Sequence, residues 1–188
     1  RHAAQLVRAG AVGNVVCGQA LYSGQVFNIG THLFDALRMI VPSDDMRVCA
    51  SRAWNMQSDD PFVSGMAVFS DSTFSIQSTG RKADLLFEVD IIGTEGRLHI
   101  LENGAILKHE RFERSQRYSG YRELFDQPVE GIPSEDRFLR ALRELSSVLD
   151  GDCGSPACSG IDGAWAVHMA NSLIESAVRQ YQWVDCRM

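Results

Sequence analysis

Residues 24–35 of this 188-residue chain read Gly-Gln-Val-Phe-Asn-Ile-Gly-Thr-His-Leu-Phe-Asp, and they lie where a loop is expected to give way to a helix. Asn28 and His32 are four positions apart, so on a helix they share one face and point at one spot. An imidazole can transfer a proton near neutral pH, and an amide beside it can donate and accept hydrogen bonds. No other segment is equally prepared for chemistry, so this run marks the candidate site.

A helix is expected over 31–41, because apolar residues recur there at helical spacing. Asn28 or Thr31 could cap its first turn, and Pro42 ends it. Residues 23–28 are interpreted as a loop. Three further helical segments are expected: 1–9, a helix with Ser134 as its N-cap that runs to about 149, and 162–180.

The middle of the chain has β-rich segments separated by turn signals such as Asp-Asp-Pro and Asn-Gly. Strands are expected at 14–22, 46–56, 61–70, 73–79, 84–92, 97–101 and 105–111, with a short strand or tail at 181–185. Successive strands with short turns usually pair antiparallel, which predicts a meandering sheet of about six strands. Residues 112–132 have no clear period and are interpreted as a long loop. The predicted fold class is α+β, with a large, mostly antiparallel sheet and helices on one face.

The composition narrows the functional classes. A net charge of −6 without a basic block argues against nucleic-acid binding. No apolar stretch approaches the ~18 residues that span a bilayer, so no membrane partner is expected. The five cysteines are odd in number and match no zinc spacing. Reduced thiols in a cytoplasmic protein are the favoured interpretation, with a structural metal or a catalytic thiol as the alternative, and no metal site is predicted.

Four segments in order along nearly the whole chain are similar to a known family. Residues 6–15 match its helix, glycine turn and strand, residues 24–35 its G-x-L-x-D-x-G-x-H-x-x-D, residues 88–98 its strand–GTxG–strand hairpin, and residues 159–176 its closing helix. The chain resembles the C-terminal domain of the Gfo/Idh/MocA oxidoreductases, the glucose–fructose oxidoreductase and inositol dehydrogenase family. The resemblance implies that residues 1–188 form a C-terminal domain like that of glyceraldehyde-3-phosphate dehydrogenase, which binds substrate and mediates oligomerisation.

The resemblance also implies a cofactor outside this chain. Family members carry an N-terminal Rossmann domain that binds NAD or NADP, and a Glu-Lys-Pro whose lysine assists the chemistry. This sequence contains neither a G-x-G-x-x-G nor a Glu-Lys-Pro, and it opens at Arg1 inside a helical pattern. We therefore expect a fragment of a longer two-domain chain. No residue here is assigned to the cofactor, and the isolated domain is expected to be inactive.

By the same resemblance, His32 is the catalytic acid or base, and Asn28 stands where the family has an aspartate. An amide can hold a ring or a hydroxyl, but it cannot stabilise an imidazolium by charge. Tyr22 and Thr31 are candidate substrate-binding residues, although a core or rim aromatic is the favoured interpretation of Tyr22. The plain alternatives are a half-buried structural histidine and an Asn28 that only caps or turns the chain. Asp35 is expected to be structural, bonding the backbone or Arg38.

The implied activity is reversible hydride transfer on a sugar, inositol or related polyol. Apolar residues along 61–76 do not all fall on one strand face, which favours a homo-dimer or tetramer formed through the sheet. Two alternatives remain open. One is a non-catalytic sugar-binding or scaffold member of the family, which the Asn28 departure motivates. The other is an unrelated α+β module.

Overall fold

The computed structural model describes residues 1–43, 45–129 and 136–187. The helices in this part of the chain are α1 (His2–Arg8), α2 (Thr31–Ile40), α3 (Arg137–Leu149) and α4 (Gly160–Val178), with a π-helical turn η1 (Val26–Gly30) and a 3₁₀ turn η2 (Glu102–Gly104). The strands are β1 (Val15–Tyr22), β2 (Met46–Trp54), β3 (Phe62–Phe69), β4 (Ser72–Ser78), β5 (Phe87–Gly93), β6 (Gly96–Leu101), β7 (Ile106–Arg114), β8 (Arg122–Gln127) and β9 (Val184–Cys186). No helix in these residues is long and apolar enough to cross a membrane.

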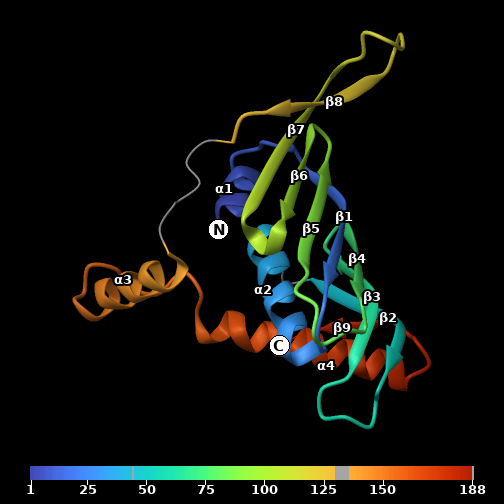
Figure 1. The fold of residues 1–188 in the computed structure, drawn as a ribbon, viewed down its shortest axis with the longest axis vertical. Coiled ribbons are helices and arrows are strands. Elements are labelled where there is room, and N and C mark those ends of the chain that lie inside the picture. Colours follow the sequence, from blue (N-terminus) through green and yellow to red (C-terminus); the bar gives the residue numbers. More distant parts are fainter. Residues whose placement is uncertain (44, 130–135, 188) are drawn as a thin grey trace.

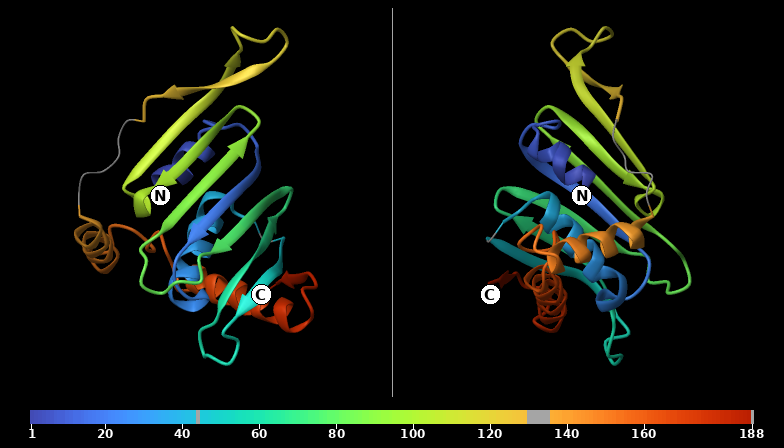
Figure 2. Two further views of the ribbon diagram at one scale, coloured as in Figure 1. Left: turned by 45° about the vertical axis from the view of Figure 1, so that its right-hand side comes forward. Right: turned by 90° about the vertical axis from the view of Figure 1, so that its left-hand side faces the viewer.

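The described strands form one nine-stranded sheet in the order β8-β7-β6-β5-β1-β4-β3-β2-β9 (Figure 1). Neighbouring strands are antiparallel except β1 and β4, which run parallel. Helices α1, α2 and α4 cover one face of the sheet, and α3 stands apart from it (Figure 2). The predicted α+β fold with a mostly antiparallel sheet and helices on one face is confirmed.

The sheet is larger than the predicted six-strand meander, and its order differs in the middle. Strand β1 lies between β4 and β5, so these two successive strands do not pair with each other. Gly18 in β1 permits this insertion, because a Cβ there would lie 2.4 Å from both the Asp90 carbonyl oxygen and the Phe74 ring. The sequence pattern predicts where each strand lies along the chain. The position of β1 at the centre of the sheet depends on packing against residues far away in the sequence.

The interpretation of residues 112–132 as a loop is wrong over half of its described part. Strand β7 continues to Arg114, and β8 pairs with it antiparallel, with Phe112 opposite Leu124. This end of the sheet projects beyond the helices (Figure 1), so neither of its faces is buried in a core. A strand without a buried face has no need for alternating polarity, which is why the sequence shows no period here.

The core fills the space between the sheet and helices α1, α2 and α4. Leu33, Phe34 and Leu37 on α2 are fully buried, and they belong to the same core cluster as equally buried residues of the central strands, such as Phe74 and Ile76. This packing fixes the orientation of α2. The expected helix stripe is therefore confirmed as the face that holds α2 on the sheet.

The ends of the helices depart in part from the sequence analysis. The predicted N-cap Ser134 lies outside the described residues. The structure shows Asp136 capping α3, where one carboxylate oxygen accepts from the amides of Phe138 at 2.8 Å and Leu139 at 3.2 Å. Aspartate is among the preferred N-cap residues because its side chain satisfies amides that have no partner within the helix.

Candidate active site

The segment before α2, expected to be a loop, is largely a single π-helical turn. Its widened geometry lets the Gly30 amide donate to the Gln25 carbonyl, five residues back, at 3.1 Å. Such turns are rare and occur often at functional sites. The turn runs directly into α2, so the helical segment begins at Val26 rather than at residue 31.

The free amides at the start of this turn are satisfied from another loop. The Asp60 carboxylate accepts from the Phe27 amide at 2.8 Å and from the Asn28 amide at 3.1 Å. The Asp60 carbonyl also accepts from the Gln25 side chain at 2.8 Å. The sequence marks residues 58–61 only as a turn, because nothing local shows that Asp60 faces a helix start 33 positions away.

Neither proposed cap of α2 acts as one. The Thr31 hydroxyl donates to the Phe27 carbonyl at 2.7 Å, inside the helical turn, and no side-chain cap bond forms at the start of α2. The physical reason is that the helical turn continues through Gly30, whose φ of −57° and ψ of −38° are helical, so α2 has no free start at residue 31. The free start lies at Val26, where Asp60 accepts from the amides of Phe27 and Asn28. Thr31 is also not among the residues that line the pocket described next.

Asn28 and His32 line one pocket of about 600 Å³. Both side chains are exposed, and neither has a hydrogen-bond partner among the described residues. Their spacing of four therefore does place an amide and an imidazole at one spot. An exposed His32 without a partner does not match the alternative of a half-buried histidine bonded to the backbone.

Three other parts of the chain complete the pocket, and sequence reasoning missed them. The walls include Ser23, the loop 82–86, Phe87 and Asn103. Asp84 in this loop pairs with Arg81 at 2.6 Å, whereas Lys82 has no ion pair among the described residues. A strand was expected from residue 84, but it starts at Phe87, and the residues before it form part of the pocket wall.

Two turns with left-handed residues lie next to or in the pocket wall: one at Gly80, just before the loop 82–86, and one at Asn103. Gly80, with φ +70°, packs against the indole of Trp54, and a Cβ at this glycine would lie 2.6 Å from the ring. On the other side, Asn103 has φ 58° between two further left-handed residues. Asn-Gly is a common signal for such turns. The turn itself was therefore predictable, but its place beside His32 was not.

Tyr22, a predicted substrate contact, does not reach the pocket. Its side chain is fully buried, and its hydroxyl donates to the Val63 carbonyl at 2.6 Å. Burial, as the largest cause, raises the pKa of Tyr22 to about 12. The structure thus places Tyr22 in the core, which corresponds to the alternative considered for it.

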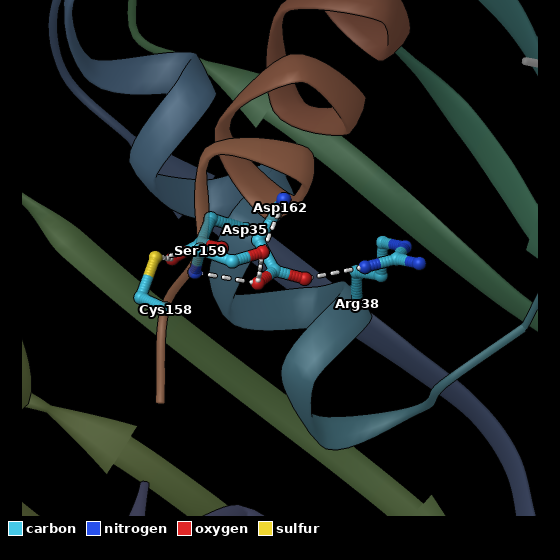
Figure 3. Close-up of polar contacts among 5 residues, drawn as sticks. All are labelled: Asp35, Arg38, Cys158, Ser159 and Asp162. Carbon is cyan, nitrogen blue, oxygen red and sulfur yellow. Dashed lines mark hydrogen bonds and ion pairs between the residues drawn. The ribbon is translucent and has the colours of Figure 1, made fainter. Parts of the chain in front are cut away.

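One turn after His32, the junction between α2 and α4 holds a dense polar cluster (Figure 3). Arg38 donates to Asp162 at 2.7 Å. Asp162 also accepts from the Ser159 amide at 2.8 Å and hydroxyl at 2.7 Å, which makes a capping box at the start of α4. The Cys158 thiol donates to Asp35 at 3.8 Å.

The junction shifts the pKa values of its acids in opposite directions. Burial, followed by the nearby Asp162, raises the pKa of Asp35. Hydrogen bonds from Ser159, its amide first, lower the pKa of Asp162. Burial and the Asp35 carboxylate raise the pKa of Cys158, so this cysteine remains a thiol at neutral pH and is a poor nucleophile.

All five cysteines are in the described part of the chain, and all are free. Among the described residues, no group of three or more His, Cys, Asp or Glu side chains could hold a metal ion. Among the described residues, the pocket around His32 is therefore the best candidate for a functional site. It is open, and the side chains of Asn28 and His32 on its wall form no hydrogen bonds with other described residues.

No protein-family model and no curated protein matches the sequence. Solved structures do match the fold. Levoglucosan dehydrogenase in complex with NADH and L-sorbose superposes with a TM-score of 0.74 at 17% identity, over 98% of this chain and 62% of that chain. Aldose-aldose oxidoreductase from Caulobacter crescentus, complexed with glycerol, gives 0.73 at 15% identity, over 97% and 59%. An oxidoreductase domain protein from Kribbella flavida gives 0.73 at 16% identity, over 99% and 63%.

These likenesses confirm the fold that the resemblance to the Gfo/Idh/MocA C-terminal domain implied. The chain spans about three fifths of the length of the solved structures it matches. At such low identity, the similarity extends to the fold, and the chemistry of the site has to be argued from its own residues.

Proposed function

We propose that this chain is the C-terminal substrate-binding and oligomerisation domain of an NAD(P)-dependent oxidoreductase that acts on a sugar, inositol or related polyol. The observation that carries the proposal is the pair Asn28 and His32, which are exposed on one pocket wall and whose side chains form no hydrogen bond within the described part of the chain. The pocket, about 600 Å³, is large enough for a monosaccharide. Solved structures of the same fold carry NADH with levoglucosan or L-sorbose.

In the proposed enzyme, one domain binds the cofactor that exchanges the hydride, and this domain binds the substrate and transfers the proton. NAD(P), held by a domain that precedes Arg1, would supply the hydride acceptor or donor. This chain has no G-x-G-x-x-G to approach a pyrophosphate, and none of its residues is assigned to the dinucleotide. Its own residues bind the substrate and handle the proton.

In the oxidation direction, His32 accepts the proton of the substrate hydroxyl as the C–O bond becomes a carbonyl. The carbinol C–H hydrogen leaves with its electron pair as hydride, so the substrate loses two electrons and two hydrogens in all. In the reverse direction His32 returns the proton to the carbonyl oxygen. Asn28 orients a hydroxyl through its amide, and Lys82 is a further donor on the pocket wall.

We also propose a cytoplasmic homo-dimer or tetramer. The face of the sheet opposite the helices is uncovered, and it carries the exposed Met66 together with the Arg97–Asp90 ion pair at 2.5 Å. An antiparallel sheet with one uncovered, partly apolar face is suited to pairing with a second copy. The five free cysteines fit a reducing compartment.

The test is an activity assay of the full-length protein, expressed from its source gene, on a panel of sugars and polyols with NAD and NADP. It should be paired with the variant Asn28→Asp. A carboxylate one turn before His32 favours the imidazolium, so we expect kcat to rise about two- to tenfold, with the acidic limb of the pH–rate profile moved upward.

The second candidate is a non-catalytic sugar-binding or scaffold protein, and Asn28 in place of the family's aspartate is the observation that favours it. If neither the wild type nor Asn28→Asp transfers hydride to or from any polyol, while calorimetry still detects sugar binding, the enzyme proposal is abandoned for this one.

A further inference from the structure

Helix α3 presents a row of large apolar side chains to solvent. Phe138, Leu139, Leu142, Leu145 and Leu149 are exposed by 81%, 51%, 62%, 52% and 77%, and we call this set the α3 stripe. No residue of α3 whose side chain is described is buried. The helix stands apart from the sheet in Figure 1 and in the left view of Figure 2. Contiguous apolar surface of this kind marks an interaction site.

The opposite side of α3 is tied to the rest of the molecule. The Glu144 carboxylate accepts from the Arg1 guanidinium and from the Ala157 amide. Glu144 lies about 150° around the helix from the centre of the α3 stripe, at 100° per residue. The stripe is therefore turned outward, away from the part of the helix that contacts the chain.

Arg1 lies beside α3, on the side of the helix opposite the α3 stripe. Arg1 contacts α3 through Glu144, and it also lines a groove of about 290 Å³ together with Phe87 and Asn103. Phe87 and Asn103 line the His32 pocket as well. A path thus runs from α3 through Arg1 to the candidate active site. A polypeptide joined at Arg1 begins between the two.

We infer that the α3 stripe is the docking surface for the domain that precedes Arg1, and that docking there places this domain over the His32 pocket. The inference rests on the proposed function, which supplies a preceding domain. Its further support is that this chain covers only 62% and 59% of two solved structures with its fold, so each of them has a substantial part with no counterpart here. The partner surface is apolar, to match five aliphatic and aromatic side chains.

The first experiment is hydrogen–deuterium exchange on the full-length protein. A 13-residue helix without tertiary packing is marginal in water, so its amides would exchange quickly if the α3 stripe stayed in solvent. We expect the amides of α3 to exchange at least tenfold more slowly than an unpacked helix would, at all protein concentrations. Fast exchange in a full-length protein that still turns over overturns the inference and leaves the proposed function intact.

The second experiment is the double variant Leu142→Gln/Leu145→Gln in the full-length protein, with Ile161→Gln as its control. Ile161 is exposed by 65% on α4 and lies outside the α3 stripe. The double variant should lower Tm by about 5 °C, and the control by about 1 °C or less. It should also lower kcat about tenfold, because a loosened domain no longer holds the reacting carbon and the cofactor in line.

The remaining outcomes separate the two proposals and the other occupants. Protection of α3 with no binding of NAD or NADP retains the docking and rejects the dehydrogenase. Protection that appears only at concentrations where the protein dimerises assigns the α3 stripe to a second copy, and protection only with anionic lipid vesicles assigns it to a membrane surface. Both of these overturn the inference, as does a source gene with no domain before Arg1.

Discussion

His32 and Asp35 lie one turn apart on the same helix, yet they belong to regions built in opposite ways. Asn28 and His32 are exposed in their pocket, and their side chains form no hydrogen bond among the described residues. Around Asp35, the groups of Arg38, Cys158, Ser159 and Asp162 bond one another across two helices (Figure 3). The first set is available to something outside the chain, and the second is used to hold the chain together.

Because of this contrast, we expect substitutions near His32 to affect activity and substitutions near Asp35 to affect stability. Unpaired polar groups in solvent add little to the free energy of folding, so their loss should affect activity alone. Groups that bond each other between helices contribute to folding, and their loss should affect stability alone. Three substitutions test this division, and each has a result that would contradict it.

The largest effect is expected for His32→Ala in the full-length protein. Removing a general acid or base lowers kcat by roughly 10²- to 10⁴-fold. Because His32 is exposed and has no described partner, Tm should stay within about 1 °C of the wild type. Steady-state kinetics and thermal unfolding on the same preparation check both values. A Tm loss of several degrees with retained activity would assign His32 a structural role.

The opposite pattern is expected for Asp162→Ala at the junction. The substitution removes the acceptor of the Ser159 capping box and the partner of Arg38, so the free energy of unfolding should fall by about 1–2 kcal/mol. Asp162 does not line the His32 pocket, so kcat should be retained. Urea unfolding monitors the loss, with Asp126→Ala on the exposed strand β8 as the control.

The stabilisation from Asp162 should also depend on pH. Because its pKa is lowered in the folded state, the contribution is present above the ordinary pKa of an aspartate and is lost as the pH falls through the folded value. The difference in unfolding free energy between wild type and Asp162→Ala should therefore shrink in acid. A difference that is constant from neutral pH into acid would show that the ionised carboxylate is not the stabilising group.

The smallest effect is expected for Asp35→Asn, and it should be a gain. The raised pKa of Asp35 means that folding disfavours its charged form, so stability is lost as the pH rises through the folded value. A neutral amide avoids this loss, and Tm should rise by about 1–2 °C at pH 7. The gain should vanish in acid, where Asp35 is protonated. A decrease in Tm at pH 7 would mean that the junction requires the charge.

The sequence predicted the local parts of this fold well. The apolar stripe of α2 and most strands follow from spacing within one element, and the placement of Asn28 and His32 at one pocket follows from a helical offset of four. The insertion of β1 between β4 and β5 did not follow, because it depends on Gly18 lying against residues more than fifty positions away.

The candidate site shows the same limit. Asp60, Lys82 and Asn103 come from three separate loops, and each is ordinary in its own sequence context. Only the folded arrangement brings them to the start of α2. The burial of Tyr22 was unpredictable for a related reason. The strand alternation shows which face of the sheet its side chain is on, but whether that face is covered depends on helices elsewhere in the chain.

The central place of β1 has a consequence for how the chain reaches this structure. Val15 and Ser72 are 57 positions apart and meet at 2.9 Å, and β1 needs β5 on its other edge. Among the described strands, β1 is the first to be synthesised, so it has to wait for two of the later ones. Such long loop closures slow folding, so we expect a refolding rate set by the arrival of β1 between two preformed hairpins. Until then, both edges of the strand remain open to pairing with other chains, which makes this the step most exposed to aggregation.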